Sequence, residues 1–215
     1  KPLLPIGEKP IIEIIITQLK KNGFREFVLA VGYKSKMLQT YCGDGSQYGV
    51  RIIYLEESKP SGTAGPLGCL KEKVKFKKDE SFLLMNGDIF TNLNFLKMLD
   101  YHQRKKNEIT IGVKRIKEEK PYGFIDSKNG VVKAITEKPV SVNTINAGIY
   151  IIKASVIKEV PPNTFFTMPN LINKLLLKNQ PIGAYLIKEY WLGLEQLQHF
   201  EELHNNKYIR KRIIW

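Results

Sequence analysis

Apolar positions along the chain follow two periods, and the change from one to the other predicts alternating helices and strands. Isoleucines and a leucine at helical spacing over 11–19 predict a helix that ends near Gly23. The same period predicts further helices at 35–41, 93–104, 168–178 and 194–205. Short apolar runs between turn residues predict strands at 27–31, 50–55, 82–85, 109–113, 146–152 and 182–187. This order of elements predicts an α/β protein with a mixed, mostly parallel central sheet, flanked by helices in three layers.

The second half of the chain adds a β-hairpin to this pattern. Asn129-Gly130 is a strong two-residue hairpin turn, because both residue types tolerate positive φ. The flanking segments 122–126 and 131–136 supply its strands. No internal repeat or low-complexity linker divides the sequence, so we expect residues 1–215 to form a single domain.

The composition is typical of a folded protein that works in water. Of the 215 residues, 43% are apolar and 26% are charged. No apolar run approaches the roughly 18 residues of a membrane helix, so we expect no membrane association. Cys42 and Cys69 form neither a disulfide framework nor a metal motif, which favours a reducing, cytoplasmic setting. The chain opens at Lys1 without an initiator methionine, as expected of a processed or truncated product.

The chain is strongly basic, which favours anionic partners. Lys plus Arg number 34 against 21 Asp plus Glu, giving a formal net charge of +13. The charge is scattered, and no aromatic stacking motif accompanies it. We therefore expect phosphate-bearing ligands and no nucleic acid, and nucleic-acid binding is kept as a distant third hypothesis.

One polar turn stands where a ligand site is expected. The apolar run 82–85 leads directly into Asn86-Gly87-Asp88. In open α/β sheets ligands bind at the carboxyl ends of the strands, which makes Asp88 a candidate ligand-binding carboxylate. The alternative is that Asn86-Gly87 is an ordinary turn and that Asp88 caps the next helix.

Gly62-Thr63-Ala64-Gly65 is a second candidate ligand segment, placed between a predicted strand and a helix. Small side chains let backbone N–H groups approach a ligand closely. A simple turn explains the same string, and the residues alone leave both interpretations open.

Seven segments occur in the order KPLLPIGEKPIIE, GDGSQYGV, EESKPSGTAGPLG, FLLMNGDIF, YGFID, ITEKP and INAGIY. Together they resemble the sugar-1-phosphate nucleotidyltransferase family over nearly the whole chain. Within that family the chain is most similar to guanylyltransferases that act on mannose-, heptose- or glucosamine-1-phosphate. The resemblance implies a Rossmann-like, GT-A-like fold. It also implies nucleotidyl transfer from a nucleoside triphosphate to a sugar 1-phosphate, with release of pyrophosphate.

The resemblance further implies how phosphate charge is neutralised. Asp88 matches the family's Mg²⁺-binding aspartate, and Lys1 matches its phosphate-contacting lysine. Lys138 is placed to meet the sugar phosphate as a point charge. Mg²⁺ typically uses one or two protein carboxylates and completes its octahedron with phosphate and water, so a single terminal carboxylate is chemically adequate.

Nucleotide contacts are implied for two segments. The resemblance assigns base and sugar contacts to Gly62, Thr63 and Ala64, whose small side chains permit close approach of the backbone. It assigns further nucleotide contacts to Asn86 and Gly87, beside the metal-binding aspartate.

Glu57 lies near the family position that reads the edge of the base. Guanine offers adjacent N1–H and N2–H donors, which suit an acceptor-only carboxylate, whereas uracil and thymine present one donor between two acceptors. We therefore expect GTP to be favoured over UTP or dTTP. The alternative is a solvent-facing acid beside Glu56.

Sugar contacts are implied for the second half of the chain. Tyr122 and Gly123 match the family's sugar-side loop, where backbone approaches the hexose. Glu137 is suited to accept hydrogen bonds from sugar hydroxyls, and Asn146 matches a further sugar-contacting position. The alternatives are an ordinary polar turn at Glu137 and a turn or capping role for Asn146.

Two features depart from the family pattern. The glycine-rich loop with its arginine, which normally precedes the KP segment, is not among these 215 residues. Segment 189–195 resembles the family's W-x-D segment but carries Gly193 where a second metal-binding aspartate is expected. These departures support a rival hypothesis, in which the chain binds nucleotide or nucleotide-sugar and regulates a partner. A homo-oligomer and an additional regulatory domain are also left open.

Overall fold

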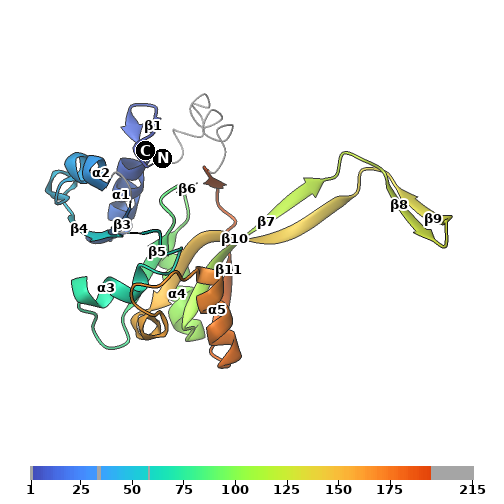
Figure 1. Cartoon of the computed structure of the whole chain (residues 1–215). Coiled ribbons are helices and arrows are strands. Elements are labelled where there is room, and N and C mark those ends of the chain that lie inside the picture. The colour runs from blue at the N-terminus through green and yellow to red at the C-terminus, as the bar shows by residue number, and fades with distance from the viewer. Residues whose placement is uncertain (1, 33–34, 58, 195–215) are drawn as a thin grey trace.

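A four-stranded sheet in the order β11-β7-β10-β5 forms the centre of the computed structural model, which describes residues 2–32, 35–57 and 59–194 (Figure 1). Its strands are β5 (Ser81–Met85), β7 (Ile109–Glu119), β10 (Val140–Lys153) and β11 (Ile182–Leu186). β7 and β11 are parallel, whereas β10 is antiparallel to both β7 and β5. The chain returns from β7 to β10 through a hairpin, and this direct connection makes the pair antiparallel.

A separate parallel pair is built from the first part of the chain. β3 (Glu26–Val31) and β4 (Arg51–Glu56) run side by side in the same direction. The connection between them contains α2 (Ser35–Cys42) and the 3₁₀ helix η1 (Ser46–Tyr48). Such a helical crossover is the connection that parallel strands require.

The first helix shows why the early sequence folds as it does. α1 (Ile11–Lys21) follows the short antiparallel pair β1 (Pro5–Ile6) and β2 (Lys9–Pro10). Its isoleucines are buried, while Lys20 and Lys21 lie in the last turn, where positive charge favours the helix dipole.

The remaining helices are set by capping side chains and apolar faces. The Asn94 side chain accepts a 3.0 Å hydrogen bond from Lys97 N at the start of α4, and Thr167 and Asn170 form a reciprocal capping box at the start of α5. The other elements of the body are α3 (Leu67–Lys73), β6 (Ile89–Thr91), α4 (Phe95–Lys105), η2 (Ala154–Glu159), α5 (Met168–Leu177) and β12 (Trp191–Gly193).

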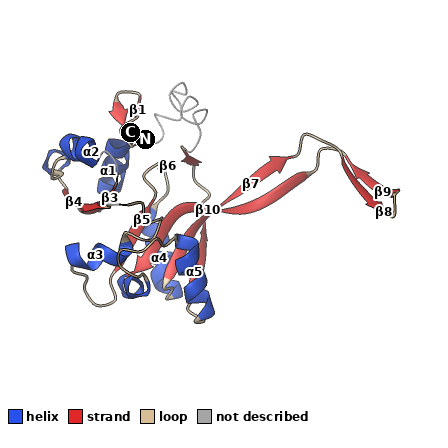
Figure 2. Cartoon of the chain, in the orientation of Figure 1, coloured by secondary structure: helices blue, strands red, loops and turns tan. Residues whose placement is uncertain are grey.

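Two apolar clusters cover the two faces of the central sheet. Along β10, Ile149 and Ile151 belong to the cluster that contains α1, whereas Tyr150 and Ile152 belong to the cluster that contains α3, η2 and α5. This alternation is that of a strand with period two, buried on both sides. The helices therefore flank the sheet on both faces (Figure 2).

An arm of strands extends from the body. In the described residues, the outer parts of β7 and β10 pair only with each other from Lys114/Ile145 to Glu119/Val140. They carry β8 (Phe124–Lys128) and β9 (Val131–Thr136) at their far end (Figure 1). Every residue of β8 and β9 is exposed.

The predicted fold class, a mixed α/β protein with a central sheet flanked by helices, is confirmed. The four-stranded sheet is not mostly parallel as expected, because β10 follows β7 through a hairpin and runs antiparallel to both β7 and β5. The structure extends the predicted strand at 109–113 to Glu119 and begins the strand predicted at 146–152 at Val140. Of the helix predicted at 194–205, Leu194 lies in a turn, and the remaining residues, like the candidate residue Lys1, lie outside the described residues. In the described part of the chain, no helix combines the length and apolar character needed to cross a bilayer.

Candidate active site

The Asn86-Gly87-Asp88 turn follows directly after β5, at the carboxyl end of that strand. Asn86 N donates a 3.0 Å hydrogen bond to Gly148 O on β10, which continues the strand ladder into the turn. Gly148 has a φ of +66°, and an added Cβ would lie 2.7 Å from the Asn86 side-chain amide. Only glycine adopts this positive φ and leaves room for the Asn86 amide without strain. Gly148 therefore allows the turn to lie close against β10.

The segment with the W-x-D resemblance lies directly beside Asp88. β12 pairs antiparallel with β6, which places Gly193 opposite Ile89. Leu194 N donates a 2.8 Å hydrogen bond to Asp88 O. The indole N–H of Trp191 donates a 2.9 Å bond to Ala147 O and so ties β12 to β10 as well. The structure therefore brings together two segments that lie about a hundred residues apart.

The Asp88 carboxylate has the chemistry of a cation ligand. Its backbone carbonyl is held by Leu194, whereas within residues 2–32, 35–57 and 59–194 its carboxylate accepts no hydrogen bond and joins no ion pair. Asp88 is half-buried, and its neighbours Asn86 and Gly87 are exposed. A carboxylate of this kind fits a hard divalent cation that draws its other ligands from phosphate and water. No group of three or more His, Cys, Asp or Glu side chains suitable for a metal occurs in the described segments.

Asn146 is held beside the same turn. Its side-chain oxygen accepts a 2.9 Å hydrogen bond from Gly148 N, and its side-chain N–H donates a 2.6 Å bond to the Tyr150 hydroxyl. Burial raises the pKa of Tyr150, so this hydroxyl stays protonated at neutral pH. Asn146 is thus linked to the Asn86 turn by way of Gly148, which bonds to both residues. Gly148 N and the Tyr150 hydroxyl hold the side-chain amide of Asn146 in one orientation.

Glu57 follows β4 and lines a separate cavity of about 280 Å³. One oxygen of its carboxylate, Oε1, accepts hydrogen bonds from Ser61 N, at 3.2 Å, and from the Ser61 hydroxyl. Lys59, Cys69 and Asn163 also line this cavity. Ser61 therefore orients the half-buried Glu57 side chain within the lining of this pocket.

The Gly62–Gly65 segment is shaped by the loop before α5. Ala64 N and Gly65 N both donate 2.9 Å bonds to Phe166 O, and the Thr63 hydroxyl accepts a 2.9 Å bond from Met168 N. Gly62 has a φ of +83°, and a Cβ there would lie 2.6 Å from Phe166 O. These N–H groups therefore hold the loop in place, and Ala64 is fully buried.

The candidate sugar residues on the arm form a second group. Tyr122 and Gly123 directly precede β8, and Glu137 and Lys138 directly follow β9. An added Cβ at Gly123 would lie 3.0 Å from Glu137 Oε2, so these residues are neighbours across the hairpin. The arm carries this group away from the β5–β6 turn (Figure 1). In this conformation Asn146 is linked to the turn that carries Asp88 through Gly148 and Asn86, whereas Tyr122, Glu137 and Lys138 lie on the arm.

Two contributors to the turn were not singled out as site residues from the sequence. Gly148 lies within the INAGIY segment. A single glycine inside an apolar strand is a signal for a β-bulge or for another backbone segment packed closely against the strand. Leu194 acts through its backbone N–H, which leaves no signal in the side-chain pattern.

The turn that carries Asp88 follows the carboxyl end of β5, and backbone hydrogen bonds hold it to β10 and to Leu194. This arrangement is that of an α/β protein with a polar ligand site at the edge of its sheet. Residues 1–208 match the nucleotidyl transferase family. The chain belongs to this family, as its sequence motifs indicated.

Two relatives match nearly the whole of this chain but only part of their own length. The mannose-1-phosphate guanyltransferase of Yarrowia lipolytica is 33% identical over 209 residues, which cover 93% of this chain and 56% of the relative. The mannose-1-phosphate guanyltransferase of Debaryomyces hansenii is 34% identical over 211 residues, with the same two coverages, 93% and 56%. The chain thus spans just over half the length of these relatives.

Solved structures share the fold at low sequence identity. HddC from Yersinia pseudotuberculosis superposes with a TM-score of 0.72 at 19% identity, covering 94% of this chain and 88% of that protein. HddC complexed with GMP-PN superposes with a TM-score of 0.72 at 18% identity, covering 94% of this chain and 88% of that protein. A putative glucose-1-phosphate thymidylyltransferase from Bacillus anthracis gives 0.73 at 19% identity, with coverages of 95% and 85%.

Proposed function

We propose that residues 1–215 form one nucleotidyltransferase domain, which transfers a nucleotidyl group from GTP to a sugar 1-phosphate and releases pyrophosphate. The observation that carries this proposal is the Asp88 carboxylate, unpaired within the described residues and placed beside the W-x-D-like strand by the Leu194–Asp88 hydrogen bond. Membership of the nucleotidyl transferase family and the guanyltransferase names of its relatives support it.

In this proposal Asp88 holds a divalent cation, taken to be Mg²⁺. Such a cation supplies charge stabilisation to the triphosphate, which is the main requirement of phosphoryl and nucleotidyl transfer. Asp88 contributes the protein carboxylate, and the Asn86-Gly87 turn contributes exposed backbone beside it. In the same proposal, Lys1 and Lys138 neutralise the negative charge of the substrate phosphates.

Base selection is assigned to Glu57. Ser61 N and the Ser61 hydroxyl both donate to Glu57 Oε1, so pairing with both guanine donors requires Oε1 to exchange a Ser61 bond for one donor while Oε2 accepts the other. A carboxylate in this position favours the paired donors of guanine over the single donor of uracil or thymine. Gly62, Thr63 and Ala64 then act by shaping the loop beside Glu57, since the N–H of Ala64 and the Thr63 hydroxyl contact the 166–168 segment.

Sugar recognition is assigned to Asn146, Glu137, Tyr122 and Gly123. Asn146 already lies beside the Asp88 turn, whereas the other three lie on the arm. The proposal therefore requires the arm to approach the turn when substrate is bound.

The test is pyrophosphate release in the presence of a divalent cation, with GTP, CTP, UTP, ATP and dTTP each combined with a panel of sugar 1-phosphates. Release that requires both substrates, and that is greatest with GTP, is the expected result. Saturable nucleotide binding without release under any combination would instead favour the rival hypothesis of a nucleotide-binding regulator, which Gly193 motivates. Tight, salt-sensitive oligonucleotide binding without nucleotide binding would overturn both.

A further inference from the structure

The arm holds its candidate sugar residues far from the body. These residues, which flank β8 and β9, are Tyr122, Gly123, Glu137 and Lys138. Between them and the body, β7 and β10 pair without a register shift over residues 114–119 of β7. At about 3.4 Å per residue, this stretch spans roughly 20 Å. Figure 1 shows the same separation, with β8 and β9 at the far end of the arm.

The base of the arm, in contrast, lies beside the Asp88 turn. Asn146 pairs with Val113 where the arm leaves the sheet, and its side chain bonds to Gly148 N. Gly148 O in turn accepts a hydrogen bond from Asn86 N. A regular antiparallel ladder twists along its length, and folding it back would break the hydrogen bonds that define it. The arm in this form therefore keeps its tip away from the turn of its own chain.

The tip of the arm exposes apolar side chains on both of its faces. Ile125 and Ile135 lie opposite each other on one face and are 62% and 67% exposed. Phe124, the neighbour of Ile125 on β8, points to the other face and is 53% exposed. An isolated two-stranded hairpin is marginally stable at best in water, and apolar surface exposed in this way marks a contact site. The tip is therefore suited to be covered by another surface.

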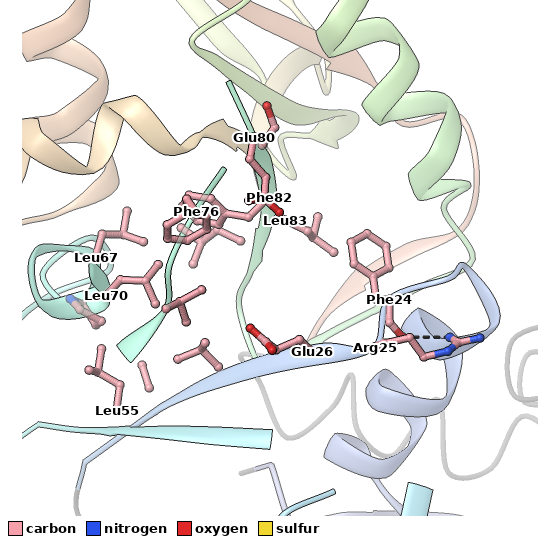
Figure 3. Close-up of a pocket in the computed structure, with 16 residues that line it drawn as sticks. Phe24, Arg25, Glu26, Leu55, Leu67, Leu70, Phe76, Glu80, Phe82 and Leu83 are labelled. Carbon is pink, nitrogen blue, oxygen red and sulfur yellow. Dashed lines mark hydrogen bonds between the residues drawn. The ribbon is translucent and has the colours of Figure 1, made fainter. Parts of the chain in front are cut away.

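Two cavities of the body do not receive the tip. Their volumes are about 310 and 280 Å³, and body residues alone line them. In the larger cavity these residues include Phe24 beside β3, Phe82 of β5 and Leu67 of α3 (Figure 3). Since neither cavity holds a residue of the arm, the tip is left for a surface outside its own body.

We propose that the arm of one copy reaches the Asp88 turn of a second copy of this chain, where Glu137 and Lys138 complete the site for the sugar phosphate. The inference rests on the proposed nucleotidyl transfer. A second copy is the occupant because the tip carries a cation and a hydrogen-bond acceptor for a sugar phosphate, and the Asp88 turn is the site that needs them. Two copies related by a two-fold axis exchange arms reciprocally, and both arms keep the form described above.

The turn is open to such a contact. Asn86 and Gly87 are exposed, and within the described residues an added Cβ at Gly87 meets no atom within 4 Å. Trp191 of β12 is half-buried, and its ring lies 3.6 Å from the Cβ position at Gly193. The receiving surface thus combines open polar backbone with an aromatic ring, and the tip combines charged with apolar side chains.

Paired variants with two different affinity tags test where the site is completed. One copy carries Asp88→Asn, the other carries Glu137→Gln, and the pair is co-expressed and purified over both tags. Pyrophosphate release is measured with the sugar 1-phosphate below its KM. With exchanged arms, one of the two sites in each pair has both native residues, so release is expected at about half the wild-type rate. If each arm served its own chain, release would be about a twentieth of that rate or less.

The matched control redistributes the same two substitutions. A copy with both Asp88→Asn and Glu137→Gln is paired with a wild-type copy and purified in the same way. Exchanged arms then leave every site with one replaced residue, so release is expected at about a twentieth of the wild-type rate. The two pairings contain the same residues, and their expected rates differ about tenfold.

A crosslinking measurement does not depend on catalysis. Gly87→Cys on one copy and Lys138→Cys on the other are treated with a short bismaleimide. Cys69→Ser is added to both copies, because Cys69 is half-buried whereas Cys42 is fully buried. A covalent pair of copies is the expected product. In the control, Leu177→Cys, at the end of α5 and 87% exposed, replaces Lys138→Cys and is expected to give no such product.

Three results would overturn the inference. The first is the reversed order of rates in the two pairings, which would show that each arm serves its own chain and would leave the proposed function in place. The second is equal crosslinking through Lys138→Cys and Leu177→Cys. The third is a wild-type chain that sediments as a monomer at every concentration. An absence of release by the wild-type protein would overturn the proposed function instead, and the crosslink would then decide whether arms are exchanged.

Discussion

Leu194 N donates a hydrogen bond to the carbonyl oxygen of Asp88 over 2.8 Å, and this contact fixes the candidate metal-binding turn against β12. The bond uses only backbone atoms, so it leaves the Asp88 carboxylate for a ligand. It also places Gly193, the residue at the position of the family's second aspartate, opposite Ile89 and one register position from Asp88. The geometry of the carboxylate turn can therefore be tested one residue at a time.

Replacing Asp88 with asparagine is expected to lower pyrophosphate release by about 10²–10³-fold, the usual cost of losing one preorganised electrostatic group. Asparagine keeps the size of the side chain and removes its charge, so the backbone bond to Leu194 persists. The control is Asp100→Asn, which removes an exposed carboxylate that pairs only with Arg104 on α4 in the described structure. A loss of the same size in both variants would contradict a metal role for Asp88.

Gly193→Asp is expected to strengthen divalent-cation binding about tenfold or more, because it adds a second carboxylate beside Asp88. The site accepts the side chain, since an added Cβ at Gly193 has its nearest neighbour, the Trp191 ring, at 3.6 Å. Binding is measured by titration with Mn²⁺ as a spectroscopic probe, together with the cation dependence of pyrophosphate release. Gly193→Asn is the matched control of equal size without charge. Equal cation affinity in the two variants would show that position 193 does not reach the cation.

The sequence predicted elements well where apolar periodicity and burial agree. The isoleucines of α1 and the run that forms β5 were identified because each is an apolar pattern that packs against the core. The outer halves of β7 and β10 were missed because their residues pair only with each other and face solvent. Charged residues such as Lys117 and Glu118 give no apolar signal.

The candidate site was predictable only in part, because its contacts join distant segments. Asp88 was identified from the strand end that precedes it, which is a local feature. Its contact with Leu194 depends on backbone groups about a hundred residues apart. The position of Glu137 on an arm away from the turn depends on the length of β7 and β10, which the local pattern does not encode.

Glu57→Gln is expected to reduce the preference for GTP over UTP about tenfold or more, measured as the ratio of kcat/KM values. Glutamine keeps an oxygen that accepts from Ser61 but loses the charge, and hydrogen bonds to charged groups contribute roughly 1.5–3 kcal/mol. The control is Glu56→Gln, because Glu56 is the exposed neighbour and accepts from Gln39 at 2.6 Å. An unchanged GTP-to-UTP ratio in Glu57→Gln would contradict base reading by this residue.

Glu137→Gln is expected to raise the KM for the sugar 1-phosphate about tenfold and to leave the KM for the nucleotide unchanged. This split follows if the arm brings Glu137 to the sugar hydroxyls during the reaction. Glu119→Gln, at the end of β7 on the same arm, is the control for effects on the arm itself. Wild-type values in Glu137→Gln would mean that the arm stays away from the Asp88 turn throughout the reaction.

His102 is expected to make the stability of the fold depend on pH, independently of catalysis. Its ring is buried between Ser81 and Thr110, with 3.1 and 2.9 Å between ring nitrogens and hydroxyl oxygens. Burial lowers the pKa of His102 below its ordinary value. His102 in the unfolded chain therefore takes up a proton as the pH falls through about 6.5, whereas in the folded chain it takes up a proton only at lower pH. This difference stabilises the unfolded state at acid pH, by up to about 1.4 kcal/mol per pH unit.

Urea unfolding near pH 7.5 and near pH 5.5 is the measurement for His102→Gln. The wild-type protein is expected to lose more stability on acidification than His102→Gln, by up to about 1 kcal/mol, because glutamine does not titrate. The comparison uses the difference between the two pH values within each protein, so a uniform loss of packing in the variant cancels. Identical pH dependence in the two proteins would show that His102 can be protonated in the folded state. In that case the hydroxyls of Ser81 and Thr110 would have to accept hydrogen bonds from a charged imidazolium.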